Sequence, residues 1–213
     1  MKIGVLGTGE VGRVLGAGFA ALGHEVKIGS RNPQKPEVRE WLKKVGARAS
    51  AGTFAQAAAF GDMAVLAISW TGTENAIRLA GPENFAGKAV IDVTNPLDFS
   101  TGAPRLAVGY TDSAGESVQR WLSEAMVVKA FNHVGNAHMV NPQFPDGPPT
   151  MLICGNDAGA KKMVTGLLEA FGCPVVDIGG IEGSRLLEPL AMLWITCGIR
   201  TNNWNHAFRL LRK

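Results

Sequence analysis

Short apolar runs alternate with segments of helical periodicity along most of the chain. The apolar runs have the length and residue types of buried parallel strands, and they lie at 2–6, 24–29, 62–68, 88–93 and 126–131. Segments with helical spacing are found at 11–22, 36–45, 53–60, 73–80 and 117–125, and a further short strand is expected at 47–49. Strands that alternate with helices predict an α/β fold built on a doubly wound parallel sheet.

A smaller unit follows this pattern. Strands are expected at 150–154 and 174–178, with a helix at 157–171 between them, and 184–212 reads as mostly helical, with Pro189 as a point of bending. The segments 97–110 and 136–149 read as loops, and loops longer than about 12 residues are usually functional or mobile. We therefore predict a main domain over 1–149 and a small C-terminal α/β extension over 150–213 that ends in a long helix.

The first strand runs directly into three glycines. Gly7, Gly9 and Gly12 are spaced G-x-G-x-x-G between the strand at 2–6 and the helix at 11–22. Gly7 permits a tight turn, Gly9 lets a pyrophosphate approach the backbone, and Gly12 lets the helix pack closely on the strand. The start of the helix then offers free N–H groups to phosphates. The pattern predicts a Rossmann-like dinucleotide site; the alternative is a glycine-rich turn that binds nothing.

The end of the second strand indicates which dinucleotide is bound. An NAD site usually has Asp or Glu about 20 residues after the first glycine, where it accepts from the ribose 2′-hydroxyl. This chain has Ser30, Arg31 and Asn32 there, with Lys35 just beyond. Ser30 and Asn32 can donate to a 2′-phosphate, and Arg31 can pair with it while stacking on adenine. We therefore expect NADP(H), with a solvated loop position as the alternative for Arg31.

The carboxyl ends of the other strands carry further candidate residues, because ligands of open parallel sheets lie over these ends. The candidates are Ile68, Ser69 and Trp70 after one strand and Thr94, Asn95 and Pro96 after the next. Trp70 either stacks on a ligand ring or packs on its own helix. Asn95 before Pro96 either holds a carboxamide such as that of nicotinamide or forms only a turn.

Lys129 lies inside an apolar strand, where an ammonium is costly unless it points at a partner or out of the edge of the sheet, and we expect it to have a functional or phosphate-facing role. Other chemistry finds little support. His133 and His138 are five residues apart and would not share a helix face, so a metal site is not expected. We find neither a catalytic carboxylate pair nor a Ser or Cys nucleophile in a recognisable elbow. No catalytic side chain is therefore predicted.

The composition indicates which ligands and which cellular compartment to expect. A net charge of +3 is mildly basic and favours anionic ligands, but no basic stripe with interleaved aromatics suggests nucleic acid. The three cysteines are far apart and are typical of core residues in a reducing cytosol. No signal peptide precedes the first strand, and the apolar run at 189–199 is too short to span a bilayer. We expect a cytoplasmic protein that does not associate with membranes.

Five segments together resemble a known family. GTGEVG, GSRNP, a strand ending in AISW, VKAFNHVGN and a helix with GSRLLEPLAMLWI are similar, in that order, to the F420-dependent NADP oxidoreductases, over nearly the whole chain. The oxidoreductase domain of the STEAP metalloreductases belongs to the same group, and VVKAFN resembles it especially. Members of the family pass a hydride between NADPH and the deazaflavin coenzyme F420. Archaeal members carry a histidine at the position of Asn132, and the last helix here ends in a different, Trp-rich and basic sequence.

The resemblance assigns roles to residues of this chain. It implies that Thr8, Gly9, Glu10 and Val11 contact the pyrophosphate, that Ser30, Arg31 and Lys35 hold the 2′-phosphate, that Ile68 lines the nicotinamide ribose, and that Asn95 and the stretch from Asn132 to Asn136 flank the nicotinamide. The function it implies is hydride exchange between NADP(H) and a second, small-molecule ring substrate, with coenzyme F420 as the first choice. The alternatives are a reductase of a flavin, ferric chelate, imine or carbonyl compound, and an NADPH-binding sensor without turnover.

The last helix predicts an interface. It contains Trp194 and Trp204, together with more large apolar residues than one exposed helix carries in a monomer. A second copy of the chain would cover them. We therefore expect a homodimer formed through this helix, which would also border the acceptor site.

Overall fold

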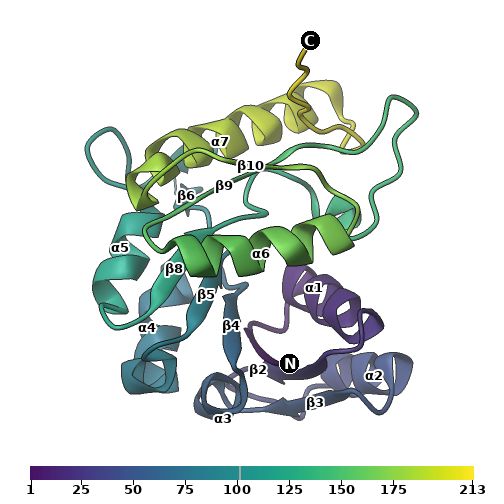
Figure 1. The fold of residues 1–213 in the computed structure, drawn as a ribbon, viewed down its shortest axis with the longest axis vertical. Coiled ribbons are helices and arrows are strands. Elements are labelled where there is room, and N and C mark those ends of the chain that lie inside the picture. Colours follow the sequence, from purple (N-terminus) through teal and green to yellow (C-terminus); the bar gives the residue numbers. More distant parts are fainter. Residues whose placement is uncertain (101) are drawn as a thin grey trace.

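An eight-stranded sheet forms the centre of the protein, seen in a computed structural model that describes residues 1–100 and 102–213 (Figure 1). Its strand order is β10-β9-β8-β5-β4-β1-β2-β3. The bounds are β1 (Lys2–Leu6), β2 (Glu25–Gly29), β3 (Ala49–Gly52), β4 (Met63–Leu66), β5 (Ala89–Asp92), β8 (Met126–Lys129), β9 (Met151–Gly155) and β10 (Val175–Asp177). Strand β1 lies between β2 and β4 and is parallel to both, so the chain winds outward in both directions from its first strand. The predicted doubly wound α/β fold is confirmed.

The pairing of β8 with β9 is antiparallel, whereas the other pairings in this sheet are parallel. Lys129 lies opposite Cys154 in this pair. Strands β9 and β10 of the predicted extension therefore continue the main sheet in the reverse direction. Residues 150–213 share one sheet with residues 1–149.

Helices cover both faces of the sheet. They are α1 (Glu10–Ala21), α2 (Pro36–Val45), α3 (Phe54–Phe60), α4 (Trp70–Ala80), α5 (Ala114–Trp121), α6 (Ala158–Ala170) and α7 (Ser184–Thr201), with short 3₁₀ turns η1 (Pro82–Phe85), η2 (Asn136–His138) and η3 (Ile181–Gly183). The apolar faces of α1, α2 and α6 share one buried cluster with the strands, and those of α3, α4 and α5 share another. The two clusters lie on opposite faces of the sheet, which is the layered arrangement that a doubly wound sheet requires.

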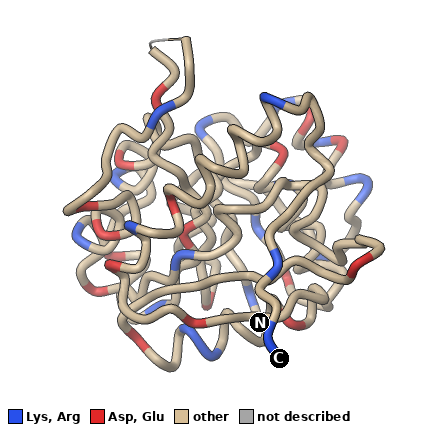
Figure 2. The backbone as a smooth tube through the Cα atoms, turned by 90° about the horizontal axis from the view of Figure 1, so that it is seen from above, with Lys and Arg blue, Asp and Glu red and all other residues tan. Residues whose placement is uncertain are grey.

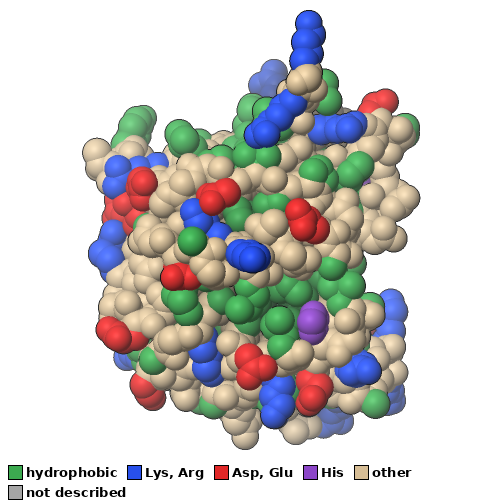
Figure 3. All heavy atoms as spheres, in the orientation of Figure 1, with side chains coloured by type: hydrophobic (Ala, Val, Ile, Leu, Met, Phe, Trp, Pro, Cys, Tyr) green, Lys and Arg blue, Asp and Glu red, His purple; other side chains and the backbone are tan. Residues whose placement is uncertain are grey.

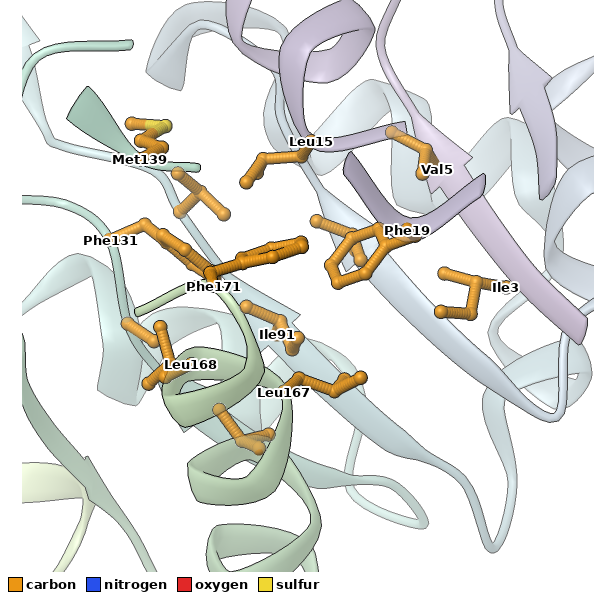
Figure 4. Packing of buried hydrophobic residues seen from close by; sticks show 14 of the residues in the cluster. Ile3, Val5, Leu15, Phe19, Ile91, Phe131, Met139, Leu167, Leu168 and Phe171 are labelled. Atoms are coloured by element: carbon orange, nitrogen blue, oxygen red, sulfur yellow. The ribbon is translucent and has the colours of Figure 1, made fainter. Parts of the chain in front are cut away.

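Three phenylalanines from distant parts of the chain contact one another within the first buried cluster. Phe19 of α1 contacts Phe171 at 5.1 Å between ring centroids, and Phe171 contacts Phe131 at 6.2 Å (Figure 4). A Cβ at Gly18 would lie 2.7 Å from a methyl carbon of Val140 and 3.0 Å from the Phe171 ring, so the glycine lets α1 approach this layer. Burial of three such rings makes α6 an integral part of the core.

Local signals placed most elements within a few residues, but three helices differ from the prediction. Helix α4 begins at Trp70 rather than at residue 73, and α5 covers 114–121 rather than 117–125. The reason for the second shift is a cap, because the Ser113 hydroxyl accepts from the N–H of Glu116 and starts the helix early. The final helix ends at Thr201, where Asn202 adopts φ 48°, a left-handed conformation that stops it.

The segment after α7 is not helical, contrary to the prediction for 184–212. It folds back instead: Trp194 Nε1 donates to the carbonyl of His206 at 2.8 Å, and Thr150 N donates to that of Phe208 at 3.1 Å. Trp204 packs on Trp194, with the ring centroids 5.3 Å apart. The two tryptophans that predict an interface thus pack partly against each other.

A small hairpin lies in the segment predicted to be a loop at 97–110. Strand β6 (Leu97–Asp98) pairs antiparallel with β7 (Arg105–Leu106), and an ion pair at 2.7 Å joins Asp98 to Arg105. Thr101, within this segment, lies outside the described residues. Two-residue strands carry too little periodicity to stand out in the sequence.

Charges of both signs are interspersed along the backbone (Figure 2). In the face shown in Figure 3, hydrophobic side chains gather across the middle, next to α6. Within the described residues, no helix is long and apolar enough to cross a membrane.

Candidate functional site

Two adjoining cavities lie along the carboxyl edge of the parallel strands. The first, of about 630 Å³, is the glycine-loop cavity and is lined by Gly7, Thr8, Gly9, Ser30, Arg31, Asn32, Lys35, Phe54, Ala67, Ile68 and Ser69. The second, of about 590 Å³, is the strand-end cavity and is lined by Gly9, Glu10, Val11, Ala67, Ile68, Ser69, Trp70, Thr71, Val93, Thr94, Asn95, Leu97, Asp98, Phe99 and Asn136. They share Gly9 and the residues from Ala67 to Ser69. Together they form one elongated cleft.

The glycine loop has the geometry that its spacing predicts. Gly7 has φ 123°, which an L-residue rarely adopts, and its N–H donates to the carbonyl of Gly29 at 2.9 Å. A Cβ at Gly12 would collide with the carbonyl oxygen of Gly7, so this glycine permits the close packing of α1 on β1. At Gly9, by contrast, a Cβ would meet nothing within 4 Å and would project into open space.

That open space lies at the start of α1, of which Gly9 is the N-cap residue. The first N–H groups of a helix have no partner within it and carry the positive end of the helix dipole. A phosphate can approach them because no Cβ stands at Gly9. Glu10, the first residue of the helix, has its carboxylate 3.4 Å from the amide nitrogen of Asn136. The free N–H groups at the start of α1 and the open space at Gly9 therefore suit a pyrophosphate.

The end of β2 supplies polar groups to the same cavity. Ser30 is nearly buried, and its Oγ accepts from the N–H of Asn32 at 3.0 Å, while the Asn32 side chain accepts from Gln34 N at 3.1 Å. These two bonds fix a tight turn. Arg31 and Lys35 are exposed beside it, and among the residues that the structure describes none forms an ion pair with Arg31. The cavity thus has an unneutralised cation at its rim.

Trp70 forms part of the wall of the strand-end cavity. Its ring stacks on Trp121 of α5, with the centroids 5.5 Å apart and the planes 24° apart. Trp70 therefore packs on a neighbouring helix rather than on its own, and because it also lines the cavity, stacking on a ligand ring stays a prediction. Ile68 and Ser69 lie just before it and line both cavities, Ser69 as the residue that precedes α4.

Asn95 and Asn132 close the far end of the cleft through their amides. Asn95 Nδ2 donates to the carbonyl of Asn132 at 2.7 Å, and Asn132 Nδ2 donates to Asn95 Oδ1 at 3.0 Å and to the carbonyl of Leu187 at 2.9 Å. The amide of Asn95 is therefore engaged by the protein itself. Pro96, just after it, is buried and lines none of the cavities described.

Two further walls of the cleft come from the hairpin and from α7, and the sequence did not single out the hairpin residues. The hairpin residues Leu97, Asp98 and Phe99 border the strand-end cavity, and the Phe99 side chain is 61% exposed. Hydrogen bonds from Ser100 and Arg105 lower the pKa of Asp98 to about 2, so its carboxylate remains charged at neutral pH. The long predicted loop was the only signal for this wall.

The second wall belongs to α7. A cavity of about 210 Å³ adjoins Asn95, Asn132 and Asn136, and Trp194 and Ile195 of α7 line its other side. The extension therefore reaches the cleft directly. A larger groove, of about 680 Å³, lies between α1 and α2 around Trp41 and shares Glu10 and Asn136 with the strand-end cavity.

The expectation that Lys129 faces a phosphate is wrong. Its side chain is fully buried, and its Nζ lies 2.8 Å from Asp92 Oδ2 and 2.9 Å from Glu188 Oε1, so it faces neither a phosphate site nor the cleft. Only long-range pairing reveals these partners, since they are 37 and 59 residues away in sequence. His133 is also buried and accepts from the N–H of Leu152, and burial lowers its pKa to about 4. It is therefore neutral near pH 7.

The cleft thus combines the open helix start at Gly9, a cationic rim and a largely apolar chamber. Of the predicted site residues, those of the glycine loop, the β2 end and the β4 end line it, with Thr94, Asn95, Asn132 and Asn136 at its far end. Gly12 supports it from below, and Pro96 and Lys129 lie outside it. Such an arrangement can bind a dinucleotide in extended form and leave space beside its second base.

Residues 2–96 match the family model described as NADP oxidoreductase, coenzyme F420-dependent. The chain is 33% identical to the F420-dependent NADP reductase of Methanocaldococcus jannaschii, over 99% of this chain and 98% of that protein. It is 30% identical to rat Metalloreductase STEAP3 over 90% of this chain but only 37% of that protein. A crystal structure of a candidate F420-dependent NADP reductase from Arthrobacter sp. FB24 superposes with a TM-score of 0.94 at 40% identity, covering all of both chains.

Proposed function

The chain belongs to the family of F420-dependent NADP oxidoreductases and is an NADP-dependent oxidoreductase, and from this premise we propose that it exchanges a hydride between NADP(H) and coenzyme F420. One observation carries the proposal: the phosphate cradle at Gly9 opens into a chamber large enough for two stacked rings. The curated relatives matched over nearly their full length are named for this reaction.

NADP(H) fits the cleft in one direction. The pyrophosphate would lie on the first turn of α1, with the 2′-phosphate near Ser30, Asn32, Arg31 and Lys35. The nicotinamide would then enter the strand-end cavity, between Ile68 and Trp70 on one side and Thr94 and Asn95 on the other. Two features favour the phosphorylated coenzyme: no carboxylate follows β2 at 30–32, and Arg31 forms no ion pair with any residue that the structure describes.

The second ring would lie against the nicotinamide, near the hairpin and α7. When both are bound, NADP(H) and the deazaflavin supply the redox chemistry, and the protein supplies contact and alignment at about 3–3.5 Å. Neutral residues, mostly apolar, make up most of the lining of this space, together with the two acidic residues Glu10 and Asp98. Such walls exclude water and leave the flat faces of the rings free to stack.

A direct assay tests the acceptor. The protein is mixed with NADPH and coenzyme F420, and the loss of absorbance of the oxidised deazaflavin is followed, with NADH as the matched donor control. Turnover with NADPH supports the proposal. Parallel reactions contain a flavin, a ferric chelate, an imine or a carbonyl compound. Turnover with one of these acceptors and none with the deazaflavin would overturn the proposal. If no acceptor supported NADPH oxidation, the proposal would also fail, and the protein would be an NADPH-binding sensor without turnover.

The rival with a specific observation behind it is a flavin or metal-chelate reductase. The likeness to Metalloreductase STEAP3 supports this alternative, since it covers 90% of the chain. Because the Asn132 side chain is a small neutral amide, its charge does not select one acceptor ring over another. The parallel acceptors in the assay separate the two functions.

We infer that residues 1–149 hold the coenzyme, that 150–213 complete the acceptor side, and that two copies associate through α7. Leu186 and Leu193 are 69% and 51% exposed on one face of that helix, with Leu190 between them. Exposed leucines at this spacing suit an isologous interface. Light scattering should report a dimer that Leu193→Glu dissociates and that Leu79→Glu, an exposed leucine of α4, leaves intact. A wild-type monomer at micromolar concentration would exclude this interface.

A further inference from the structure

The Lys129 ammonium lies at the centre of a fully buried charged cluster. Its Nζ is 2.8 Å from Asp92 Oδ2, 2.9 Å from Glu188 Oε1 and 2.8 Å from the carbonyl oxygen of Thr94. All three charged side chains are at most 1% exposed. The ammonium thus donates a hydrogen bond to the Thr94 carbonyl, just after β5, and forms ion pairs with Asp92 of β5 and Glu188 of α7.

The cluster holds two carboxylates for one ammonium, and backbone N–H groups offset the excess charge. Glu188 accepts from the N–H of Ala114 and of Gly115 at 3.0 Å each, which are the first residues of α5. Asp92 Oδ1 accepts from the N–H of Thr94 at 2.9 Å. Burial disfavours the charged form of Lys129, but the two carboxylates outweigh it and raise the Lys129 pKa above its ordinary value.

The backbone packs closely around this cluster. A Cβ at Gly115 would collide with the side chain of Ser184 and would lie 3.3 Å from Cε of Lys129. Glycine at this position therefore brings the start of α5, the start of α7 and Lys129 together. Such a site leaves the ammonium little freedom to move.

Thr94 is held by this cluster at both of its backbone polar groups. Its N–H donates to Asp92, and its carbonyl accepts from Lys129. The next residue, Asn95, is bonded to Asn132, whose amide also donates to the carbonyl of Leu187, one residue before Glu188. The far wall of the strand-end cavity is therefore fixed by a closed ring of bonds that begins and ends at Lys129.

We propose that Lys129 is a positioning residue: through Asp92, Glu188 and Thr94 it fixes the wall of the cleft that faces the nicotinamide and holds α7 in register with it. The assignment rests on the proposed binding direction of NADP(H), but not on the identity of the acceptor. The cluster itself touches no ligand. It acts on the cofactor through Thr94 and Asn95, whose side of the cavity it keeps in place.

The test compares two ligands of the same site. Adenosine 2′,5′-bisphosphate carries the adenine and 2′-phosphate of NADPH but lacks the nicotinamide end. In Lys129→Met, the affinity for NADPH should fall roughly tenfold, while that for the bisphosphate should change less than about twofold. Calorimetric titration measures both. Phe85→Leu, a core change in η1 away from the cleft, is the control for general destabilisation and should leave the ratio of the two affinities unchanged.

Glu188→Gln decides the question if Lys129→Met does not fold, because it leaves Asp92 and Lys129 as a neutral pair. Its NADPH affinity should fall in the same selective way, by a smaller factor. An equal loss of affinity for both ligands would overturn the proposal in favour of a purely structural role. An unchanged NADPH affinity in a folded variant would overturn it too. Neither measurement involves coenzyme F420. The role of Lys129 can therefore be judged even if coenzyme F420 proves not to be the acceptor.

Discussion

Asn95 and Asn132 face each other across the ends of β5 and β8 and exchange two hydrogen bonds, of 2.7 and 3.0 Å. The Asn132 amide makes a further bond to α7 through the carbonyl of Leu187. Asn132→Ala should therefore lower the free energy of unfolding by about 1–3 kcal/mol, because it leaves buried acceptors without donors. Urea denaturation at pH 7 measures this loss. Asn136→Ala, which removes only the long bond to Glu10, is the matched control and should change stability little; equal stability of the two variants would contradict the prediction.

The coenzyme preference depends on Arg31. Arg31→Ala should weaken NADPH binding roughly ten- to a hundredfold, since a hydrogen bond to a charged group contributes about 1.5–3 kcal/mol, and should leave NADH binding nearly unchanged. Titration of both coenzymes gives the result. Arg39→Ala on α2 removes a comparable exposed cation, bonded only to Gln34, and should alter neither affinity. Equal binding of NADH and NADPH by the unmodified protein would exclude this role for Arg31.

Gly9 and Gly12 should respond in opposite ways to the same substitution. Gly9 has φ −69° and open space at its Cβ position, so Gly9→Ala should fold normally while its methyl group blocks the phosphate, lowering NADPH affinity at least roughly tenfold. Gly12→Ala places its methyl against the Gly7 carbonyl and should cost about 1–3 kcal/mol of stability. Thermal unfolding and coenzyme titration separate the two effects. Full NADPH affinity in Gly9→Ala would mean that the pyrophosphate lies elsewhere.

His133 makes stability depend on pH. Burial lowers its pKa from 6.5 to about 4, so between these values the unfolded chain binds a proton that the folded protein does not. Stability is therefore complete above pH 6.5 and is lost as the pH falls, by about 2 kcal/mol between pH 7 and 5 from this group alone. In His133→Gln, which keeps an acceptor for Leu152 N, this part of the pH dependence should disappear. Urea denaturation midpoints are measured for both proteins between pH 7 and pH 5. If the midpoint falls equally with pH in the wild type and in His133→Gln, the prediction is incorrect.

The coenzyme half of the cleft was predictable because its signals are local. The turn at Gly7, the open position at Gly9 and the polar residues after β2 follow from a few neighbouring residues and from the rule that parallel strands end at one edge. The same rule identified Ile68 and Asn95. Their contacts with NADP(H) remain predictions.

The other half depends on contacts between distant residues. A lysine in an apolar strand signals a partner, but periodicity does not say whether that partner is a ligand or the carboxylate of Glu188. The return of the chain after Thr201 is likewise fixed by Trp194 and Thr150, which lie far back in the sequence. The hairpin at Leu97–Asp98 was too short to recognise.

The burial of Lys129 also determines when the cleft can be completed during synthesis of the chain. A chain is synthesised from its N-terminus, and Asp92 precedes Lys129, while Glu188 follows it by 59 residues. Until α7 emerges, Lys129 has only one of its two carboxylates, and the N–H groups of Ala114 and Gly115 lack their acceptor. The coenzyme half therefore reaches its final form only when the end of the chain docks, so a partly made chain does not present a finished cleft to NADP(H).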